Sequence, residues 1–347
     1  MDPIHAESNF AYHGLQTKSA GNNETDVIKG MAQTDQVKSL IRTFLEDIKF
    51  DRSSPFIKDH QMEVAVWQYF KSLNLGQKME NSVQRTLKLS VTFTHQAYTA
   101  LPFDIRVLCA IQFLYMFLVD DVAEVFMSDL QAFGQNFVLN KPHSNTLLDG
   151  FDCHLRNLSF HYGPYCHSAI IKSLIDYVNG RIIEHRMEQS SFKFSAESRL
   201  MPMFLRTKVG GAEILVHLLY PKAIFPEDEY VIQYFPAIQE LVLFIDFAND
   251  ILSYYKEFCL DDEKGNFVAN FADTHNIQHL DVLKYLTSYT PKLLKSVYQL
   301  LNSNLSLLQS VETFTRGWIM LCTAHRRYHL VELFADEQYL PPYDEDA

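Results

Sequence analysis

The chain has 347 residues and a formal net charge of −12 at neutral pH. A protein with this charge repels the phosphate backbone of nucleic acids, so we expect no nucleic-acid partner, and a polyphosphate ligand would need metal ions or well-placed Arg and Lys residues. Hydrophobic residues make up 47% of the sequence and charged residues 21%, which is typical of a globular protein rather than a disordered or fibrous one.

The five cysteines and the apolar segments indicate where the protein resides. The cysteines are spread along the chain without a CxxC pair, which favours reduced thiols in an intracellular protein over a zinc site or a disulfide framework. The N-terminal sequence lacks the basic and apolar regions of a secretory signal. Even the run AIQFLYMFLV at 110–119 is shorter than a membrane-spanning helix. We therefore expect a cytoplasmic protein with no membrane span.

Apolar residues recur at helical spacing through most of the chain, without a break that resembles a linker. Alternating Val, Ile and Thr of the kind that forms strands is scarce. Residues 1–33 are polar and are expected to form a flexible leader, and residues 336–347 an acidic tail. The pattern predicts a single all-α domain over residues 34–335.

The expected helices cover, in chain order, residues 35–49, 61–74, 80–99, 104–122, 125–136, 144–158, 165–188, 197–218, 227–257, 278–304 and 308–334. Two segments within them, residues 105–119 and 237–248, are apolar on nearly all sides. This is typical of central helices that other helices surround. Each of the two is followed by acidic residues, and these two helix ends are the first candidate functional segments.

The first acidic helix end is LVDDVAE, residues 118–124. Asp120 and Glu124 are four residues apart and therefore lie on one helical face, whereas Asp121 is rotated by about 100° from Asp120. Two carboxylates in this arrangement fit a shared metal site. Acidic residues at the solvated exit of a buried helix fit the same pattern.

The second acidic helix end is NDILSYYKE, residues 249–257. Asn249, Ser253 and Glu257 lie along one stripe that spans about 12 Å of helix axis. Their amide, hydroxyl and carboxylate oxygens are ligands suited to Mg²⁺. The polar face of an amphipathic helix is the structural alternative. The presence of two oxygen-rich segments, each after an apolar helix, favours a metal site.

Basic residues complete the set of candidates. A diphosphate bound by magnesium also needs positioned cations, and Lys256 lies within the second motif. Arg206 in FLRTKVGG and the segment HRRYHL at 325–330, which contains Arg327 and Tyr328, supply more. Each of these residues, taken alone, also fits a surface salt bridge or a helix C-terminus.

Together these segments resemble the class I terpene cyclases, and specifically the fungal trichodiene synthase family. LVDDVAE resembles the aspartate-rich motif of that family, NDILSYYKE its second metal-binding motif, and HRRYHL its terminal Arg-Tyr segment. HYGPYCHSAIIKSLIDYVNG (161–180), FLRTKVGG (204–211) and YPKAIF (220–225) match the intervening stretches in order. The resemblance covers roughly residues 80–334 and implies a helical bundle around a central active-site cavity.

The resemblance implies an enzyme that uses three magnesium ions. Asp120 would ligate two of them, with Glu124 as the last acid of the same motif. Asn249, Ser253 and Glu257 would hold the third ion.

The resemblance also implies the residues that act on the diphosphate. The expected catalytic residues are Asp120 and four residues that hydrogen-bond the diphosphate, namely Arg206, Lys256, Arg327 and Tyr328. The implied substrate is the C15 farnesyl diphosphate, the product is a sesquiterpene hydrocarbon or alcohol, and the relatives form dimers. The alternatives are a cyclase of a C10 or C20 diphosphate, and a non-catalytic helical isoprenoid-binding relative. A chain-elongating prenyltransferase normally carries a second aspartate-rich motif where this chain has NDILSYYKE.

Two residues depart from the pattern of trichodiene synthase, which has Asp at the position of Glu124 and no polar residue at that of Asp246. Asp246 fits either a hydrogen-bonding group behind the site or a buried structural acid. Aromatic residues of the helices are candidates for the wall of the cavity, although plain core packing explains them equally well. These candidates are Phe113, Tyr115, Phe117, Phe244, Phe247 and Trp318.

Overall fold

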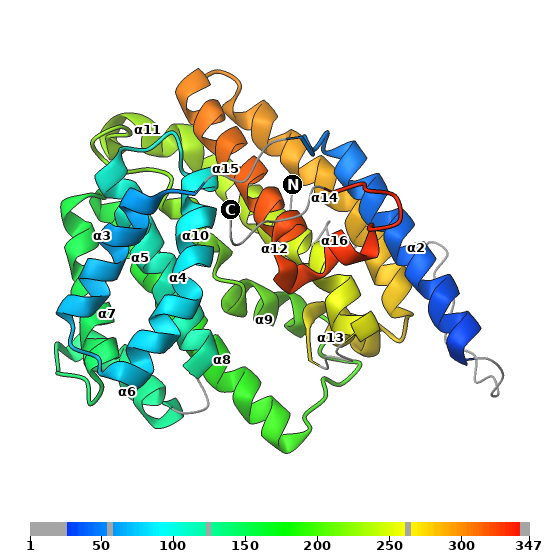
Figure 1. The fold of residues 1–347 in the computed structure, drawn as a ribbon, viewed down its shortest axis with the longest axis horizontal. Coiled ribbons are helices and arrows are strands. Elements are labelled where there is room, and N and C mark those ends of the chain that lie inside the picture. The colour runs from blue at the N-terminus through cyan, green and yellow to red at the C-terminus, as the bar shows by residue number, and fades with distance from the viewer. Residues whose placement is uncertain (1–25, 54–57, 123–125, 261–264, 341–347) are drawn as a thin grey trace.

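A computed structural model describes residues 26–53, 58–122, 126–260 and 265–340. In these ranges every regular element is a helix, which confirms the predicted all-α class (Figure 1). The α-helices are α2 (Asp26–Asp47), α3 (His60–Ser72), α4 (Gln77–Ala97), α5 (Phe103–Val122), α6 (Met127–Leu139), α7 (Thr146–Asn157), α8 (Pro164–Ser190), α9 (Met201–Val209), α10 (Ala212–His217), α11 (Glu227–Tyr234), α12 (Ile238–Tyr254), α13 (Phe267–His275), α14 (His279–Leu301), α15 (Leu305–Ala324) and α16 (Leu330–Leu333). The short elements are η1 (Leu158–Phe160), η2 (Phe235–Ala237), η3 (Tyr255–Leu260) and η4 (Arg326–Tyr328).

The helix expected over 197–218 is two helices, α9 and α10. They are separated by Gly210 and Gly211, and Gly211 adopts a left-handed conformation with φ of +64°. A side chain at Gly211 would also lie 2.5 Å from Cε of Met116 in α5. Glycine therefore serves the turn between α9 and α10.

The helix expected over 227–257 consists of four pieces, because its winding changes three times. Pro236 cannot donate a backbone hydrogen bond, and α11 passes through the 3₁₀ turn η2 before α12 begins. After Tyr254 the chain continues as the π-helix η3. Lys256 and Glu257 therefore lie on a wider turn than the α-helix that the spacing predicts.

Other boundaries differ for local reasons. α2 begins at Asp26, before the expected start at residue 35, and α13 was not expected. The side chain of Asn266 caps α13 by accepting a hydrogen bond from the backbone N–H of Ala269. The last expected helix, 308–334, ends at Ala324 and is followed by η4, after which His329 has a φ of +55°.

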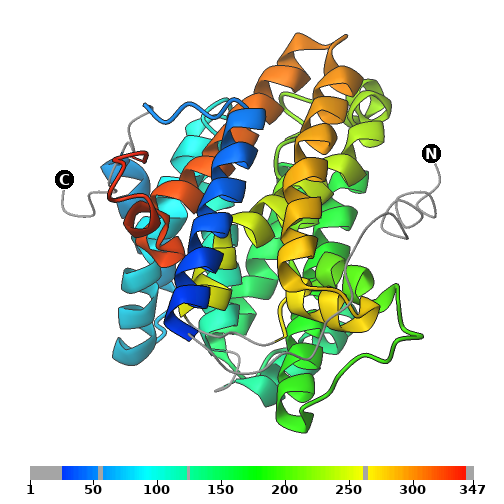
Figure 2. The same ribbon diagram turned by 90° about the vertical axis from the view of Figure 1, so that its right-hand side faces the viewer.

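The helix α12 lies inside the bundle and packs against α14, α15, α10 and α9. The helix α5 packs against α3 and α4, and α15 lies between α4 and α12. On one side of the bundle α2 lies beside α14 (Figure 2). The C-terminal end of α12 thus faces α9 and η4, which is where the candidate site residues meet.

Gly317 in α15 allows the close approach of α15 to α4. A Cβ atom at this position would lie 2.5 Å from Cα and 2.6 Å from N of Ala97, and backbone atoms cannot turn aside as a side chain can. We expect Gly317→Ala to lower the free energy of unfolding by about 2 kcal/mol, because overpacking outweighs the better helix propensity of alanine. Urea denaturation measures this value. Gly134→Ala is the matched control, since its Cβ would meet only Cγ2 of Ile175 at 3.5 Å, and equal stability of the two variants would contradict the prediction.

One helical run in the described part of the chain, Glu227–Leu260, is long and apolar enough to cross a membrane by length and composition. Half of its most apolar window is buried within the bundle, and the core helix of a soluble protein meets the same criterion. The absence of a membrane span therefore stays a prediction.

Candidate active site

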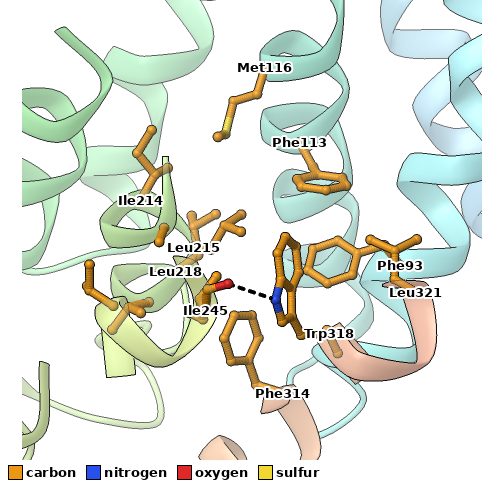
Figure 3. Close-up of a cluster of buried hydrophobic side chains, with 14 of the residues drawn as sticks. Phe93, Phe113, Met116, Ile214, Leu215, Leu218, Ile245, Phe314, Trp318 and Leu321 are labelled. Carbon is orange, nitrogen blue, oxygen red and sulfur yellow. Dashed lines mark hydrogen bonds between the residues drawn. The ribbon is translucent and has the colours of Figure 1, made fainter. Parts of the chain in front are cut away.

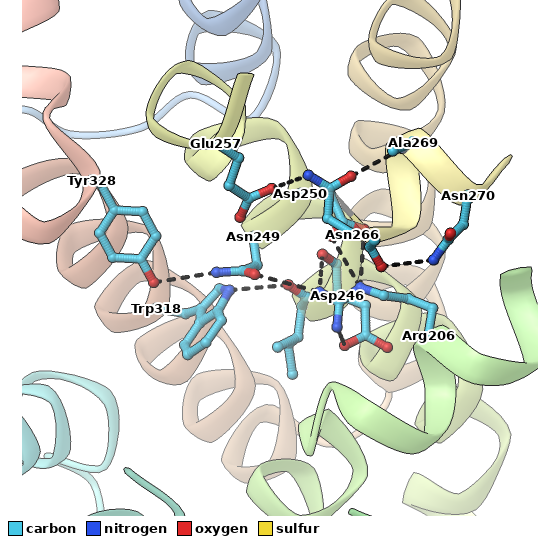
Figure 4. A network of polar contacts seen from close by, with 12 residues as sticks. Arg206, Asp246, Asn249, Asp250, Glu257, Asn266, Ala269, Asn270, Trp318 and Tyr328 are labelled. Atoms are coloured by element: carbon cyan, nitrogen blue, oxygen red, sulfur yellow. Dashed lines mark hydrogen bonds and ion pairs between the residues drawn. The ribbon is translucent and has the colours of Figure 1, made fainter. Parts of the chain in front are cut away.

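Arg206 of α9 is held against α12 by two buried carboxylates (Figure 4). Its Nε donates to both oxygens of Asp250, at 3.0 and 3.1 Å, and its Nη1 is paired with Oδ1 of Asp246 at 3.2 Å. Its Nη2 donates to the backbone oxygen of Asp246 at 2.9 Å and to Oδ1 of Asn249 at 3.4 Å. The side chain of Arg206 is 10% exposed, and those of Asp246 and Asp250 are 2% and 9% exposed.

Burial raises the pKa of Asp246 and of Asp250 to about 6, although the Arg206 guanidinium lowers both values. The two carboxylates and the electrostatic influence of Glu257 raise the pKa of Arg206 above its already high value, against the effect of burial. Arg206 is therefore a permanent cation that offsets part of the negative charge at this end of α12.

Asn249 connects this cluster to η4. Its Nδ2 donates to the hydroxyl oxygen of Tyr328 at 3.2 Å, while its Oδ1 accepts from Arg206. One turn further along α12, Ser253 is buried and its hydroxyl has no hydrogen-bond partner. Glu257 accepts a hydrogen bond from Nδ2 of Asn266 at 3.0 Å, so the cap residue of α13 holds its carboxylate. Of the oxygen-bearing side chains of NDILSYYKE, Asn249 and Asp250 thus contact Arg206, and Asn249 also contacts Tyr328.

Asp120, near the end of α5, is flanked by two guanidinium groups. Its carboxylate is 2.9 Å from Nε of Arg181 in α8 and 3.9 Å from Nη2 of Arg327 in η4. Arg181 is also paired with Glu184 at 2.6 Å. Burial raises the pKa of Glu184, whereas Arg181 and Arg206 lower it. Glu184 therefore interacts electrostatically with both Arg181 and Arg206. The adjacent residues Arg327 and Tyr328 of η4 connect the group around Asp120 with the group around Arg206.

Aromatic side chains lead from this polar region into the core. The Arg327 guanidinium lies 5.6 Å from the ring centre of Phe117, and Phe117 contacts Phe113 edge to face at 4.4 Å. Phe113 contacts Phe93, which contacts Trp318. Trp318 donates a hydrogen bond to the backbone oxygen of Ile245, one turn before Asn249 in α12. Side chains from α4, α5, α10, α12 and α15 surround this path (Figure 3).

The six aromatic wall candidates do not share one location in the core. Phe113, Phe117 and Trp318 belong to the path just described, whereas Tyr115 stacks on Phe151 of α7 at 4.4 Å. Phe247 stacks on Phe267 of α13 at 5.7 Å. Phe244 is fully buried. Periodicity alone could not separate these groups, because α5 and α12 are apolar on several faces.

The comparison with known families decides what this arrangement belongs to. Residues 37–340 match the family model described as trichodiene synthase (TRI5). The chain belongs to the trichodiene synthase family. The resemblance found in the sequence is thereby confirmed, and so is the enzyme class, terpene synthase, a carbon–oxygen lyase that acts on prenyl diphosphates.

Relatives of the trichodiene synthase family cover most of the chain at modest identity. The (E)-beta farnesene synthase of Metarhizium brunneum is 24% identical over 90% of this chain and 93% of its own. The alpha-cuprenene synthase COP6 of Coprinopsis cinerea is 26% identical over 74% and 77%. The trichodiene synthase of Fusarium pseudograminearum is 30% identical over 52% and 48%.

Solved structures share the fold. A hedycaryol synthase in complex with nerolidol has a TM-score of 0.56 at 14% identity and covers 82% of this chain and 98% of its own. The linalool/nerolidol synthase of Streptomyces clavuligerus has a TM-score of 0.58 at 12% identity and covers 79% and 99%.

The structure brings most of the expected site residues of the family into one region. Asp120 meets Arg327, and Arg206 meets Asn249, which meets Tyr328. Glu124 lies outside the described residues. Lys256 lies on the π-helix η3 beside Glu257. The roles of these residues as metal ligands and diphosphate contacts stay predictions.

Four further residues of the site were not expected to act there. Asp250 lies inside the quoted motif, and Arg181 and Glu184 lie one and four residues after the quoted stretch 161–180, so the sequence argument could have included them. Nothing in a sequence shows that Arg181 of one helix faces Asp120 of another. Asn266 signals only a helix cap.

The oxygen donors at the end of α12 fit a hard divalent cation such as Mg²⁺. The observation that favours this fit is the buried hydroxyl of Ser253, which has no partner although burial makes an unpaired hydroxyl costly. Within the described ranges no cluster of three or more His, Cys, Asp or Glu residues forms a metal site. A metal site at the end of α12 would therefore need the amide oxygen of Asn249 and the hydroxyl oxygen of Ser253 as ligands.

Arg181 is paired with the carboxylate of Asp120, which a metal ion at this position would need as a ligand. We expect Arg181→Met to raise the affinity for Mn²⁺ several-fold in the absence of substrate, because a paired cation is removed from Asp120. Electron paramagnetic resonance of free Mn²⁺ measures the affinity. Lys208→Met is the matched control, since Lys208 is equally exposed and pairs with Asp176 instead. An equal gain in both variants would mean that net charge alone matters.

Proposed function

We propose that the chain is a magnesium-dependent sesquiterpene cyclase, which ionises farnesyl diphosphate and cyclises it to a sesquiterpene hydrocarbon or alcohol with release of diphosphate. The observation that carries the proposal is the chain of hydrogen bonds from Arg206 through Asn249 to Tyr328, next to the pair of Asp120 and Arg327. The relatives named as farnesene, cuprenene and trichodiene synthases support a C15 substrate.

The basic and hydroxyl groups stabilise the departing diphosphate in this proposal. Arg206 stays charged, and burial raises the pKa of Tyr328 well above its ordinary value, so the hydroxyl of Tyr328 stays protonated. The oxygen of Tyr328 accepts from Asn249, and its hydroxyl also interacts with the thiol of Cys322, which the diphosphate would replace as the acceptor of its hydrogen. Bound magnesium would supply Lewis acidity and charge stabilisation at the leaving group. These donors act on charge that develops during ionisation and require no covalent nucleophile.

The aromatic path receives the hydrocarbon part of the substrate in this proposal. Phe117, Phe113 and Trp318 lie directly beneath the polar residues and exclude water from an allylic cation. Their ring faces also favour positive charge. A dedicated general base is not evident among the described side chains of this region, and the released diphosphate can take the terminal proton.

Three ions, a homodimer and a cytoplasmic location belong to the same proposal. Asp120 and Glu124 would serve two ions, and Asn249, Ser253 and Glu257 the third.

The proposal is tested by incubating the purified protein with farnesyl diphosphate, with and without Mg²⁺, and analysing the extract by gas chromatography and mass spectrometry. Geranyl and geranylgeranyl diphosphates are run in parallel. We expect a cyclic C15 product that depends on magnesium. A product only from the C10 or C20 substrate would correct the chain length. No product from any of the three would support a non-catalytic isoprenoid-binding relative.

A further inference from the structure

Asp246 is an acidic residue in an otherwise apolar stretch of α12. Its side chain is 2% exposed. Oδ1 is paired with Nη1 of Arg206 at 3.2 Å, whereas Oδ2 has no hydrogen-bond partner. A buried carboxylate with one unpaired oxygen is costly for the fold. We therefore asked what the contact with Arg206 provides.

Three of the five N–H groups of Arg206 donate hydrogen bonds to α12. The Nε–H serves Asp250, and the two hydrogens of Nη2 serve the backbone oxygen of Asp246 and Oδ1 of Asn249. Nη1 lies 3.2 Å from Oδ1 of Asp246 as an ion pair without a hydrogen bond. Nη1 forms no hydrogen bond with the described residues, whereas Nε and Nη2 do. Asp246 is thus the ion-pair partner of the one nitrogen of Arg206 whose N–H groups remain for a ligand.

Gly210 leaves the space in which this contact forms. A Cβ atom at Gly210 would overlap Oδ1 of Asp246 and lie 2.5 Å from Nη1 of Arg206. The backbone at Gly210 is right-handed helical, with φ of −71°, so alanine would suit the backbone, and the nearest atoms to its Cβ belong to these two side chains. The end of α9 and the side chain of Asp246 are therefore fitted around the guanidinium.

We propose that Asp246 is a positioning residue for Arg206. It fixes the plane of the guanidinium so that the free edge of Nη1 is directed at the diphosphate before the substrate binds. A fixed donor loses less conformational freedom on binding than a mobile one. This inference rests on the proposed function, because Arg206 is assigned there to the diphosphate.

A simple charge effect predicts the opposite result. Asp246 is a negative charge next to a site for a polyanion, so its removal would tighten diphosphate binding if only charge mattered. A purely structural role predicts lower stability with unchanged affinity of the folded protein. The sign of the affinity change therefore separates the three roles.

The test is calorimetric titration of the full chain with inorganic diphosphate in excess Mg²⁺. We expect Asp246→Asn, which keeps the shape but removes the charge, to weaken binding about tenfold. Asp176→Asn is the matched control, since it removes a carboxylate that pairs with Lys208 away from Arg206. Unchanged or tighter binding by Asp246→Asn would overturn the proposal. Absence of diphosphate binding by the wild-type chain would instead count against the proposed function.

Gly210→Ala provides a second route to the same contact. We expect it to weaken diphosphate binding several-fold, because the new methyl group displaces Asp246 and Arg206. In the Asp246→Ala background the clash with the carboxylate is gone, and Gly210→Ala should then have a smaller effect. Equal effects in both backgrounds would contradict the positioning role. Circular dichroism of each variant establishes that the titrated protein is folded.

Discussion

Replacing Asn249 or Glu257 by alanine is expected to lower kcat/KM by about 10³-fold or more while the helical fold stays largely intact. Each change removes an oxygen donor from the candidate metal site. Asn249→Ala also breaks the link between Arg206 and Tyr328, and Glu257→Ala leaves Asn266 without its carboxylate partner. Neither side chain is fully buried, so little packing is lost.

The measurement is steady-state turnover of farnesyl diphosphate at saturating Mg²⁺, with circular dichroism of the same samples. Asn270→Ala is a suitable control, because Asn270 lies on the adjacent helix α13 and donates only to the backbone oxygen of Gly265. Retained full activity in Asn249→Ala and Glu257→Ala would remove the basis for the metal assignment.

Replacing Arg206 by methionine is expected to lower the free energy of unfolding by about 3–5 kcal/mol at pH 8, in addition to its effect on activity. The variant leaves Asp246 and Asp250 buried without their common cation. Burial already raises the pKa of both carboxyls to about 6 with Arg206 present. Loss of the Arg206 guanidinium would raise these two pKa values further. A carboxyl with a raised pKa in the fold binds a proton more tightly there than in the unfolded chain.

The pH dependence of Arg206→Met follows from this difference. Stability of the fold decreases as the pH rises from about 4 through the raised pKa values, because the buried carboxyls must then ionise. The deficit of the variant relative to wild type should therefore be smaller at pH 5 than at pH 8. Urea denaturation at both values measures it, and a deficit that does not change with pH would contradict this account.

The sequence contained enough to predict the helical class and most residues of the site, because the motifs carry fixed spacings of oxygen donors and bases. It did not contain the partners of those residues. The pairing of Asp120 with Arg181, and of Arg206 with Asp246 and Asp250, depends on how separate helices pack. The break between α9 and α10 could have been expected from the adjacent residues Gly210 and Gly211. The continuous apolar pattern nevertheless predicted a single helix over residues 197–218.

The π-helical turn from Tyr255 to Leu260 makes the second motif depend on winding as well as on residue count. In this turn the backbone hydrogen bonds skip one more residue than in an α-helix, and Glu257 reaches Asn266 from it. Deletion of a single residue between Phe258 and Leu260 would favour a return to α-helical winding and would rotate Glu257 relative to Asn249. A related chain could therefore keep every residue of the motif and still lose the geometry that the motif needs to bind a metal ion.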